Sequence, residues 1–229
     1  QVSKKILITG TGSGLGKFLS NKYKNVICVS REIPLQKHYK KIHTIIHCAF
    51  NLKREDLNLF PNKVYKDNVV LTEKLLKIPH KRFVYISTCQ IDEMNIETES
   101  TPYIILKCLN EHMVRKKGRN YLILRPSSLL GNGMKSNSIV KLMKGNDITL
   151  TGNSVNDFVL YDDVYEAIQK PLSGTFYLLS NEKISMKEVS EHFDKKIKFG
   201  KFKYQIKTNT NIDTKKTSLE NLIKHFGGE

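Results

Sequence analysis

The segment Lys5-Ile6-Leu7-Ile8-Thr9-Gly10-Thr11-Gly12-Ser13-Gly14-Leu15-Gly16 decides the fold that we expect for this chain. An apolar run leads directly into a glycine-rich turn, and a helical pattern begins at Leu15. This order of strand, glycine turn and helix is the context that a dinucleotide-binding fingerprint requires. Gly10 would permit the tight turn, Gly14 would let the backbone approach a pyrophosphate, and Gly16 would let the helix lie close to the strand. The phosphates would then lie at the N-terminus of the helix.

Short β-rich runs alternate with helical patterns through the first half of the chain, which predicts a parallel sheet with helices on both faces. We therefore expect an α/β fold of the Rossmann type, a doubly wound parallel sheet with a small C-terminal substrate lobe. Residues 1–130 would form the dinucleotide-binding domain, and residues 155–180 would return to it. Residues 131–154 and 181–229 would form the substrate lobe. A single helix is expected over residues 62–78.

The composition is that of a globular protein with an excess of lysine. The 229 residues are 39% hydrophobic and 26% charged, and the formal net charge is +16. The lysines are spread over every segment, without an arginine-rich tract or a basic stripe interleaved with aromatic residues. We therefore expect a solvated basic surface and no nucleic-acid partner.

No apolar run is long enough to span a membrane, so we expect no membrane partner. The four cysteines, Cys28, Cys48, Cys89 and Cys108, are scattered and lack the spacing of metal ligands. The seven histidines form no HxH or HExxH pattern, and we expect no metal site. Reduced thiols and a cytoplasmic location are the corresponding predictions.

The residues after the second expected strand, Ser30-Arg31-Glu32, bear on the choice of nicotinamide cofactor. A basic residue at this place pairs with the 2′-phosphate of NADP, whereas an acidic residue binds the ribose 2′-hydroxyl of NAD. Arg31 is suited to a bidentate contact with phosphate and favours NADP. Glu32 leaves NAD as the alternative.

Tyr103 and Lys107 lie four residues apart on an expected helix and therefore share one face of it. A lysine ammonium beside the positive nicotinamide of an oxidised cofactor would favour the phenolate and lower the pKa of the tyrosine. The phenol could then act as a general acid or base near neutral pH.

Several groups of residues, in register, resemble the short-chain dehydrogenase/reductase superfamily. They are Thr9-Gly10 with Gly14-x-Gly16, Ile45-Ile46-His47-Cys48-Ala49, Asn68-Val69-Val70-Leu71-Thr72, Tyr85-Ile86-Ser87-Thr88 and Tyr103-x-x-x-Lys107. Leu124-Arg125-Pro126 and the segment Asp157-Phe158-Val159-Leu160-Tyr161-Asp162-Asp163-Val164 resemble its extended branch. That branch contains nucleotide-sugar epimerases, dehydratases and ketoreductases, and the resemblance runs from about Lys5 to Ala167.

The resemblance implies that Tyr103 is the catalytic acid or base and that Lys107 binds the nicotinamide ribose. Thr88 would bond the substrate oxygen, with Ser87 as the alternative. Binding of NADP or NAD would involve Gly10, Thr11, Ser13, Gly14, Leu15, Gly16, Ser30, Arg31, Cys48, Ala49, Phe50, Asn68, Ser87 and Pro126. The small-molecule substrate would be a nucleotide sugar, and the chain would pair into a homodimer.

The chain departs from the family pattern at several places. Its glycine spacing is that of the shorter branch, and Ile91-Asp92-Glu93 stands where the family has Val-Tyr-Gly. Asn156 replaces the usual arginine, and the short C-terminal lobe implies a reduced substrate pocket. We expect Asp92 and Glu93 to lie in a solvated loop, with a dehydratase acid or base as the alternative.

The leading hypothesis is an oxidoreductase that reduces a keto group of a nucleotide-linked sugar. A nucleotide-sugar epimerase that keeps NAD tightly bound would use the same residues and is the first alternative. A non-catalytic protein that senses NAD(P) is the second alternative, and the short lobe is its motivation.

Overall fold

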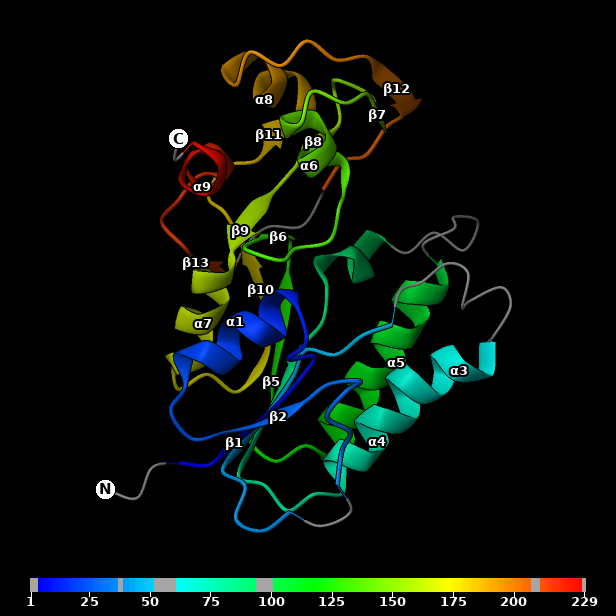
Figure 1. The fold of residues 1–229 in the computed structure, drawn as a ribbon, viewed down its shortest axis with the longest axis vertical. Coiled ribbons are helices and arrows are strands. Elements are labelled where there is room, and N and C mark those ends of the chain that lie inside the picture. The colour runs from blue at the N-terminus through cyan, green and yellow to red at the C-terminus, as the bar shows by residue number, and fades with distance from the viewer. Residues whose placement is uncertain (1–3, 37–38, 52–60, 94–100, 207–210, 228–229) are drawn as a thin grey trace.

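The computed structural model describes residues 4–36, 39–51, 61–93, 101–206 and 211–227 (Figure 1). Its centre is a seven-stranded sheet with the strand order β13-β10-β5-β4-β3-β1-β2, in which all neighbouring strands are parallel. The strands are β1 (Ile6–Thr9), β2 (Val26–Val29), β3 (Thr44–His47), β4 (Arg82–Ile86), β5 (Leu122–Pro126), β10 (Gly174–Leu179) and β13 (Ile212–Asp213). The prediction of a doubly wound parallel sheet is confirmed.

Helices cover both faces of the sheet (Figure 1). Helices α1 (Gly14–Lys22) and α7 (Tyr161–Gln169) cover one face, and α4 (Leu71–Leu76) and α5 (Thr101–Lys117) cover the other. Successive strand residues point to opposite faces, so Ile45 joins the core under α4 and α5 while Ile46 joins the core under α1 and α7. Strands that are buried on both faces read as continuous apolar runs, which is the pattern in the sequence.

The single helix expected over residues 62–78 is divided by a wider turn. Helix α3 (Pro61–Tyr65) leads into the π-helical turn η1 (Lys66–Val70), and α4 follows it. The carbonyl of Asn68 in this turn accepts bonds from the Thr72 hydroxyl at 2.6 Å and the Asn110 side-chain amide at 3.3 Å. These side-chain partners help to accommodate the wide turn, and π-turns of this kind are frequent at functional sites.

A second group of elements lies beyond the carboxyl ends of the central strands, at the top of Figure 1. It contains three short strand pairs, β6 (Ser128–Leu130) with β9 (Phe158–Leu160), β8 (Val155–Asn156) with β11 (Ile184–Ser185), and β7 (Ile148–Leu150) with β12 (Phe199–Phe202). Helices α6 (Ser138–Met143), α8 (Met186–His192) and α9 (Ser218–Phe226) enclose a hydrophobic cluster of their own with these strands. The division of the chain into two domains remains a prediction.

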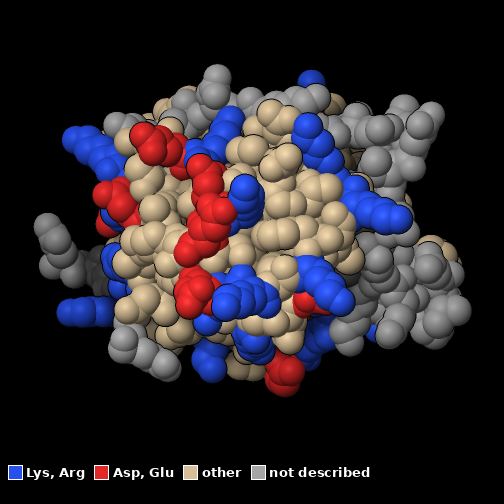
Figure 2. All heavy atoms as spheres, turned by 90° about the horizontal axis from the view of Figure 1, so that it is seen from above, with Lys and Arg blue, Asp and Glu red and all other residues tan. Residues whose placement is uncertain are grey.

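The surface carries charges of both signs. On the face seen in Figure 2, lysine and arginine side chains form separate groups between acidic side chains and uncharged areas. Within the described ranges, no helix combines the length and the apolar character that are needed to cross a membrane.

Candidate active site

The candidate site lies where the strand order of the sheet reverses. From β1 the chain passes to β2 on one side, and the next strand, β3, pairs with β1 on its other side. In open α/β sheets, ligands bind outside the carboxyl ends of the strands at such a switch point. The glycine turn follows β1 at this place, and residues 48–50 follow β3.

Close backbone contacts explain the glycines of this turn. A Cβ atom on Gly10, whose φ is 78°, would lie 3.0 Å from the Ala49 nitrogen. A Cβ atom on Gly16 would lie 2.2 Å from the Gly10 carbonyl oxygen, so α1 crosses the end of β1 at a distance that only glycine allows. The Thr11 hydroxyl donates to the Val29 carbonyl oxygen at 3.2 Å and ties the turn to β2.

The N-terminus of α1 offers free backbone N–H groups to an anion. Ser13 precedes the helix without a side-chain capping bond, and the first turn holds no acidic residue. Gly14 begins the helix with φ of 54°, and Leu15 is buried beneath it. Unpaired N–H groups and the helix dipole both favour a phosphate at this position. These residues therefore fit a dinucleotide cofactor.

The residues after β2 border the same turn. The Ser30 hydroxyl donates to the Glu32 carboxylate at 2.8 Å, and this bond lowers the pKa of Glu32. A carboxylate oxygen of Glu32 lies 3.6 Å from the position of a Cβ atom on Gly12, so the acid faces the glycine turn. The Arg31 side chain is exposed beside it.

A buried network of neutral groups holds the ends of β1 and β3 together. The Nδ1 atom of His47 lies 2.7 Å from the Thr9 hydroxyl, and Nε2 lies 2.9 Å from the Thr72 hydroxyl. Because the Thr72 hydroxyl donates to the Asn68 carbonyl, it accepts from Nε2–H of His47. Nδ1 therefore accepts from Thr9. Burial, assisted by the charge of Lys107, lowers the pKa of His47 to about 3 and keeps the ring neutral.

The network also fixes the segment after β3. The Thr9 oxygen accepts from the backbone amides of Cys48 at 3.2 Å and Ala49 at 3.1 Å. Asn68 is completely buried; its side chain accepts from the Asn51 amide at 2.7 Å and donates to the Asn51 carbonyl at 3.1 Å. The side chain of Asn68, predicted to bind the cofactor, thus holds the backbone next to Phe50.

The three predicted catalytic residues come together at the carboxyl end of β4. Thr88 follows this strand, and its side chain lies close enough to the phenol of Tyr103, in the first turn of α5, to influence the pKa of that phenol. Lys107 lies one turn further along α5 and is 4% exposed. Its ammonium donates to the Ile86 carbonyl at 2.8 Å and lies 5.8 Å from the centre of the Tyr103 ring.

Burial moves the pKa values of this pair in opposite directions. It raises the pKa of Tyr103 to about 12, although the nearby Thr88 hydroxyl acts against this shift. It lowers the pKa of Lys107 to about 7. Tyr103 is therefore a protonated phenol at neutral pH, while Lys107 is close to its titration midpoint. The expectation that the lysine lowers the pKa of the tyrosine concerns the state with an oxidised cofactor and remains a prediction.

Phe50 connects the two parts of the site. Its ring centre lies 4.2 Å from the Lys107 ammonium, and the ring meets Tyr103 edge-on at 5.2 Å between centres. Burial raises the pKa of the neighbouring Cys48 thiol to about 12, so it remains neutral. Ser87 is buried directly after β4, and Pro126 is buried at the end of β5. These two strands are neighbours in the sheet.

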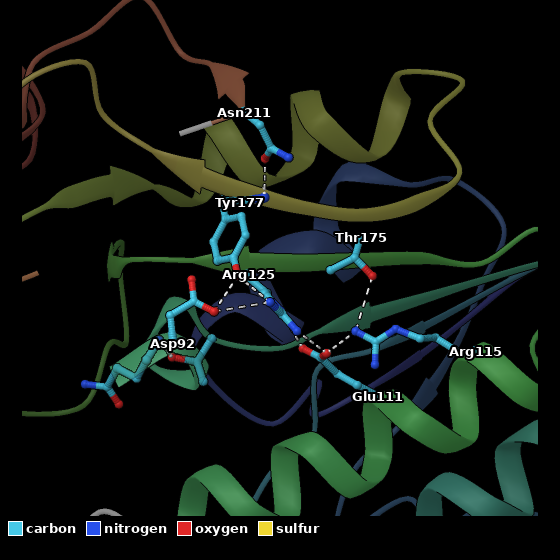
Figure 3. Close-up of polar contacts among 9 residues, drawn as sticks. Asp92, Glu111, Arg115, Arg125, Thr175, Tyr177 and Asn211 are labelled. Atoms are coloured by element: carbon cyan, nitrogen blue, oxygen red, sulfur yellow. Dashed lines mark hydrogen bonds and ion pairs between the residues drawn. The ribbon is translucent and has the colours of Figure 1, made fainter. Parts of the chain in front are cut away.

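The sequence did not predict the ion cluster around Glu111, one turn beyond Lys107 on α5 (Figure 3). Glu111, one turn after Lys107, accepts from Arg125 at 2.7 and 3.0 Å and from Arg115. Although burial raises the pKa of Glu111, these bonds hold it below its ordinary value. The spacing of four residues between Glu111 and Arg115 is the one local signal for this cluster.

Asp92 lies at the exposed edge of the same cluster: its side chain is 42% exposed, as expected of a solvated residue, although it lies in a helix and not in a loop. It lies in the short 3₁₀ helix η2 (Cys89–Glu93), accepts from the Tyr177 hydroxyl at 2.7 Å and lies 3.6 Å from Arg125. These contacts tie the segment after Thr88 to β5 and β10. Glu93 is not among the residues whose side chains are described.

No group of three or more histidine, cysteine, aspartate or glutamate side chains in the described part of the chain is arranged to hold a metal ion.

Solved structures with the same fold contain bound nicotinamide cofactors. MoeE5 in complex with UDP-glucose and NAD has a TM-score of 0.76 and 18% identity, over 97% of this chain and 96% of that one. The dTDP-4-dehydrorhamnose reductase of Bacillus anthracis in complex with NADP has a TM-score of 0.76 and 18% identity, over 100% of both chains. A UDP-galactose 4-epimerase has a TM-score of 0.64 and 17% identity, over 96% of this chain and 97% of that one. At these identities the likeness concerns the fold.

No curated protein matches the chain in a sequence comparison. A model of the NAD dependent epimerase/dehydratase family matches residues 6–174 and so confirms the resemblance to the extended branch. This chain belongs to the NAD-dependent epimerase/dehydratase family, whose model covers it from the start of β1 to the start of β10.

Proposed function

We propose that this protein is an NAD(P)-dependent oxidoreductase that reduces a keto group of a nucleotide-linked sugar. The observation that carries the proposal is the grouping of Thr88, Tyr103 and Lys107 at the carboxyl edge of the sheet. The glycine turn with its free helix N-terminus lies at the same edge. A proton donor and a phosphate site on one edge are what such a reaction requires.

The bound nicotinamide would supply the hydride, and the residues of this chain would supply binding and the proton. The amides at the start of α1 would bind the pyrophosphate, since Ser13 leaves them uncapped. The Thr88 hydroxyl would orient the carbonyl oxygen of the substrate. Tyr103 would give its phenolic proton to that oxygen, and a charged Lys107 would stabilise the phenolate that remains.

The direction of proton transfer distinguishes a reductase from an epimerase. A phenol with a pKa raised to about 12 is protonated at neutral pH and can donate at once. An epimerase that begins by oxidising the sugar needs Tyr103 as a base first. The positive nicotinamide of an oxidised cofactor would lower that pKa, so the raised value alone does not separate the two reactions. The epimerase with tightly bound NAD is the second candidate, because it shares all of these residues.

The experiment combines turnover with one variant. Purified protein is mixed with NADPH or NADH and a panel of nucleotide-linked keto-sugars, and the loss of reduced-cofactor absorbance is followed. Tyr103→Phe should lower kcat at least about 100-fold, whereas Tyr165→Phe, on α7, should leave it unchanged. Full activity in Tyr103→Phe would contradict the assigned acid. Conversion of a nucleotide sugar to its epimer without consumption of reduced cofactor would favour the epimerase.

Binding without turnover would favour the third hypothesis, the NAD(P)-sensing protein. In that case NADH or NADPH binds to the purified chain, and every substrate of the panel is left unchanged. Lys107→Ala should then preserve the sensing function, whereas in an enzyme this variant should lose activity.

The choice between NADP and NAD is tested by two neighbouring substitutions. Arg31 supports NADP, while the Glu32 carboxylate beside Gly12 supports NAD. If Arg31 binds a 2′-phosphate, Arg31→Ala should weaken NADPH binding about tenfold and leave NADH binding unchanged. If Glu32 binds the 2′-hydroxyl, Glu32→Gln should weaken NADH binding instead. Fluorescence titration of both cofactors with both variants separates the two outcomes.

Pairing of two chains through α5 is part of the same proposal. Ile105 and Leu109 lie one turn apart on this helix and are 51% and 38% exposed. Sedimentation of the purified chain tests the homodimer.

A further inference from the structure

Tyr161 reaches the glycine turn from the opposite side. It is the first residue of α7, which covers the same face of the sheet as α1. Its phenolic oxygen lies 3.2 Å from the position that a Cβ atom on Gly14 would occupy. Since Gly14 begins α1, the hydroxyl lies beside the uncapped N-terminus of that helix.

The ring of Tyr161 is held in a fixed place. The residue is 5% exposed, and a Cβ atom on Gly131 would come within 2.0 Å of the ring. The ring therefore fills space that only a glycine at position 131 leaves open. Phe18 of α1 lies on another side, with 5.6 Å between ring centres. The start of α7 is fixed as well, because Asp163 accepts from the Leu160 amide at 2.8 Å.

The hydroxyl of this buried ring forms no hydrogen bond with any of the residues that the structure describes. It is not one of the fully enclosed polar atoms. A buried phenol that lacks an internal partner and remains accessible is available to a ligand. Burial raises the pKa of Tyr161, so the group is a hydrogen-bond donor at neutral pH. A donor beside a helix N-terminus suits an anion.

We propose that the Tyr161 hydroxyl donates a hydrogen bond to the pyrophosphate of the bound dinucleotide. The anion would then be bound from two sides, by the backbone amides of α1 and by a side chain of α7. This inference rests on the proposed function, because it requires that the chain bind NAD or NADP. It adds a cofactor ligand that lies outside the glycine turn and outside the predicted set of site residues.

ADP-ribose is the probe, because it carries the pyrophosphate but no nicotinamide ring and therefore takes part in no hydride transfer. Calorimetric titration compares the wild-type chain, Tyr161→Phe and Tyr165→Phe. Phenylalanine preserves the ring and its contacts with Gly131 and Phe18. Loss of a hydrogen bond to a charged group should raise the Kd of Tyr161→Phe by about 10- to 100-fold. Tyr165→Phe, one turn further along α7, should bind as the wild type does.

A second measurement separates a direct contact from a change in packing. The ³¹P chemical shifts of ADP-ribose at saturation should differ between the wild type and Tyr161→Phe if the hydroxyl touches a phosphate. Equal affinities, or equal phosphorus shifts in the two proteins, would overturn this inference and leave the proposed function intact. A wild-type chain that binds neither ADP-ribose nor NADH nor NADPH would overturn the proposed function itself.

Discussion

The two halves of the candidate site are built from different chemistry. At the ends of β1 and β3, neutral groups form the buried connections, with the His47 ring between two threonine hydroxyls. Behind Tyr103 on α5, the connections are charges, with Glu111 between two arginines and Lys107 one turn away. A neutral network can position a backbone without an electric field, whereas a buried charge also sets the pKa values around it. The ends of β1 and β3 are therefore held together by neutral hydrogen bonds, whereas the charge of Glu111 acts on the pKa of Lys107.

The largest expected effect is the loss of the Glu111 charge. Its side chain is 1% exposed, and Glu111→Gln would leave Arg125, 13% exposed, without its buried counter-charge. Breaking a buried ion pair in this way should lower the free energy of unfolding by about 3 kcal/mol. Glu73→Gln is the control, because Glu73 pairs with Lys77 on the surface and its substitution should change the free energy of unfolding very little. Urea denaturation measures the free energy of unfolding of both variants. Similar losses in the two would show that the charge of Glu111 does not have the role of a buried ion-pair partner.

Removal of the neutral His47 ring should lower the free energy of unfolding by a smaller amount, and the loss should depend on pH. His47→Phe deprives the Thr9 hydroxyl of its acceptor and should lower the free energy of unfolding by about 2 kcal/mol. The pKa of His47 is about 3 in the folded chain and 6.5 ordinarily, so the unfolded chain binds the proton first as the pH falls. The free energy of unfolding of the wild type therefore falls as the pH drops below about 6.5, and His47 contributes up to about 1.4 kcal/mol per pH unit to this fall. Denaturation between pH 4 and 7 should show that His47→Phe lacks this component.

Substitution of Lys107 should change stability in the opposite pH range. Its pKa is about 7 when folded and 10.5 ordinarily, so above pH 7 the folded chain releases a proton that the unfolded chain keeps. Wild-type stability should rise from pH 7 toward pH 9, by at most about 1.4 kcal/mol per pH unit. Lys107→Met should lack this rise and should be at least as stable as the wild type at pH 7, although inactive. A parallel pH dependence in both proteins would show that Lys107 is not a buried cation.

Local patterns in the sequence were sufficient to predict the sheet and the glycine turn, because strands, turns and helices depend on neighbouring residues. The pair Tyr103 and Lys107 was found for the same reason, since its spacing is one helical turn. The π-helical turn was missed, because side-chain bonds from Thr72 and Asn110 to Asn68 contribute to it. The proposed role of Tyr161 and the ion pair of Arg125 were missed for a related reason. Their partners, Gly14 and Glu111, lie on other elements, and only the tertiary structure brings each pair together.

Strand β2 lies at the end of the sheet, with β1 as its one neighbour in the described part of the chain. Its four residues, Val26–Val29, are apolar, so its free edge is a template on which a second chain could add a strand. Lys22 and Lys24 precede this edge, and the net charge of +16 keeps separate molecules apart. The lysine excess thus helps to keep the protein in solution. The solubility of the protein should be lowest as the pH approaches the isoelectric point near 9.6.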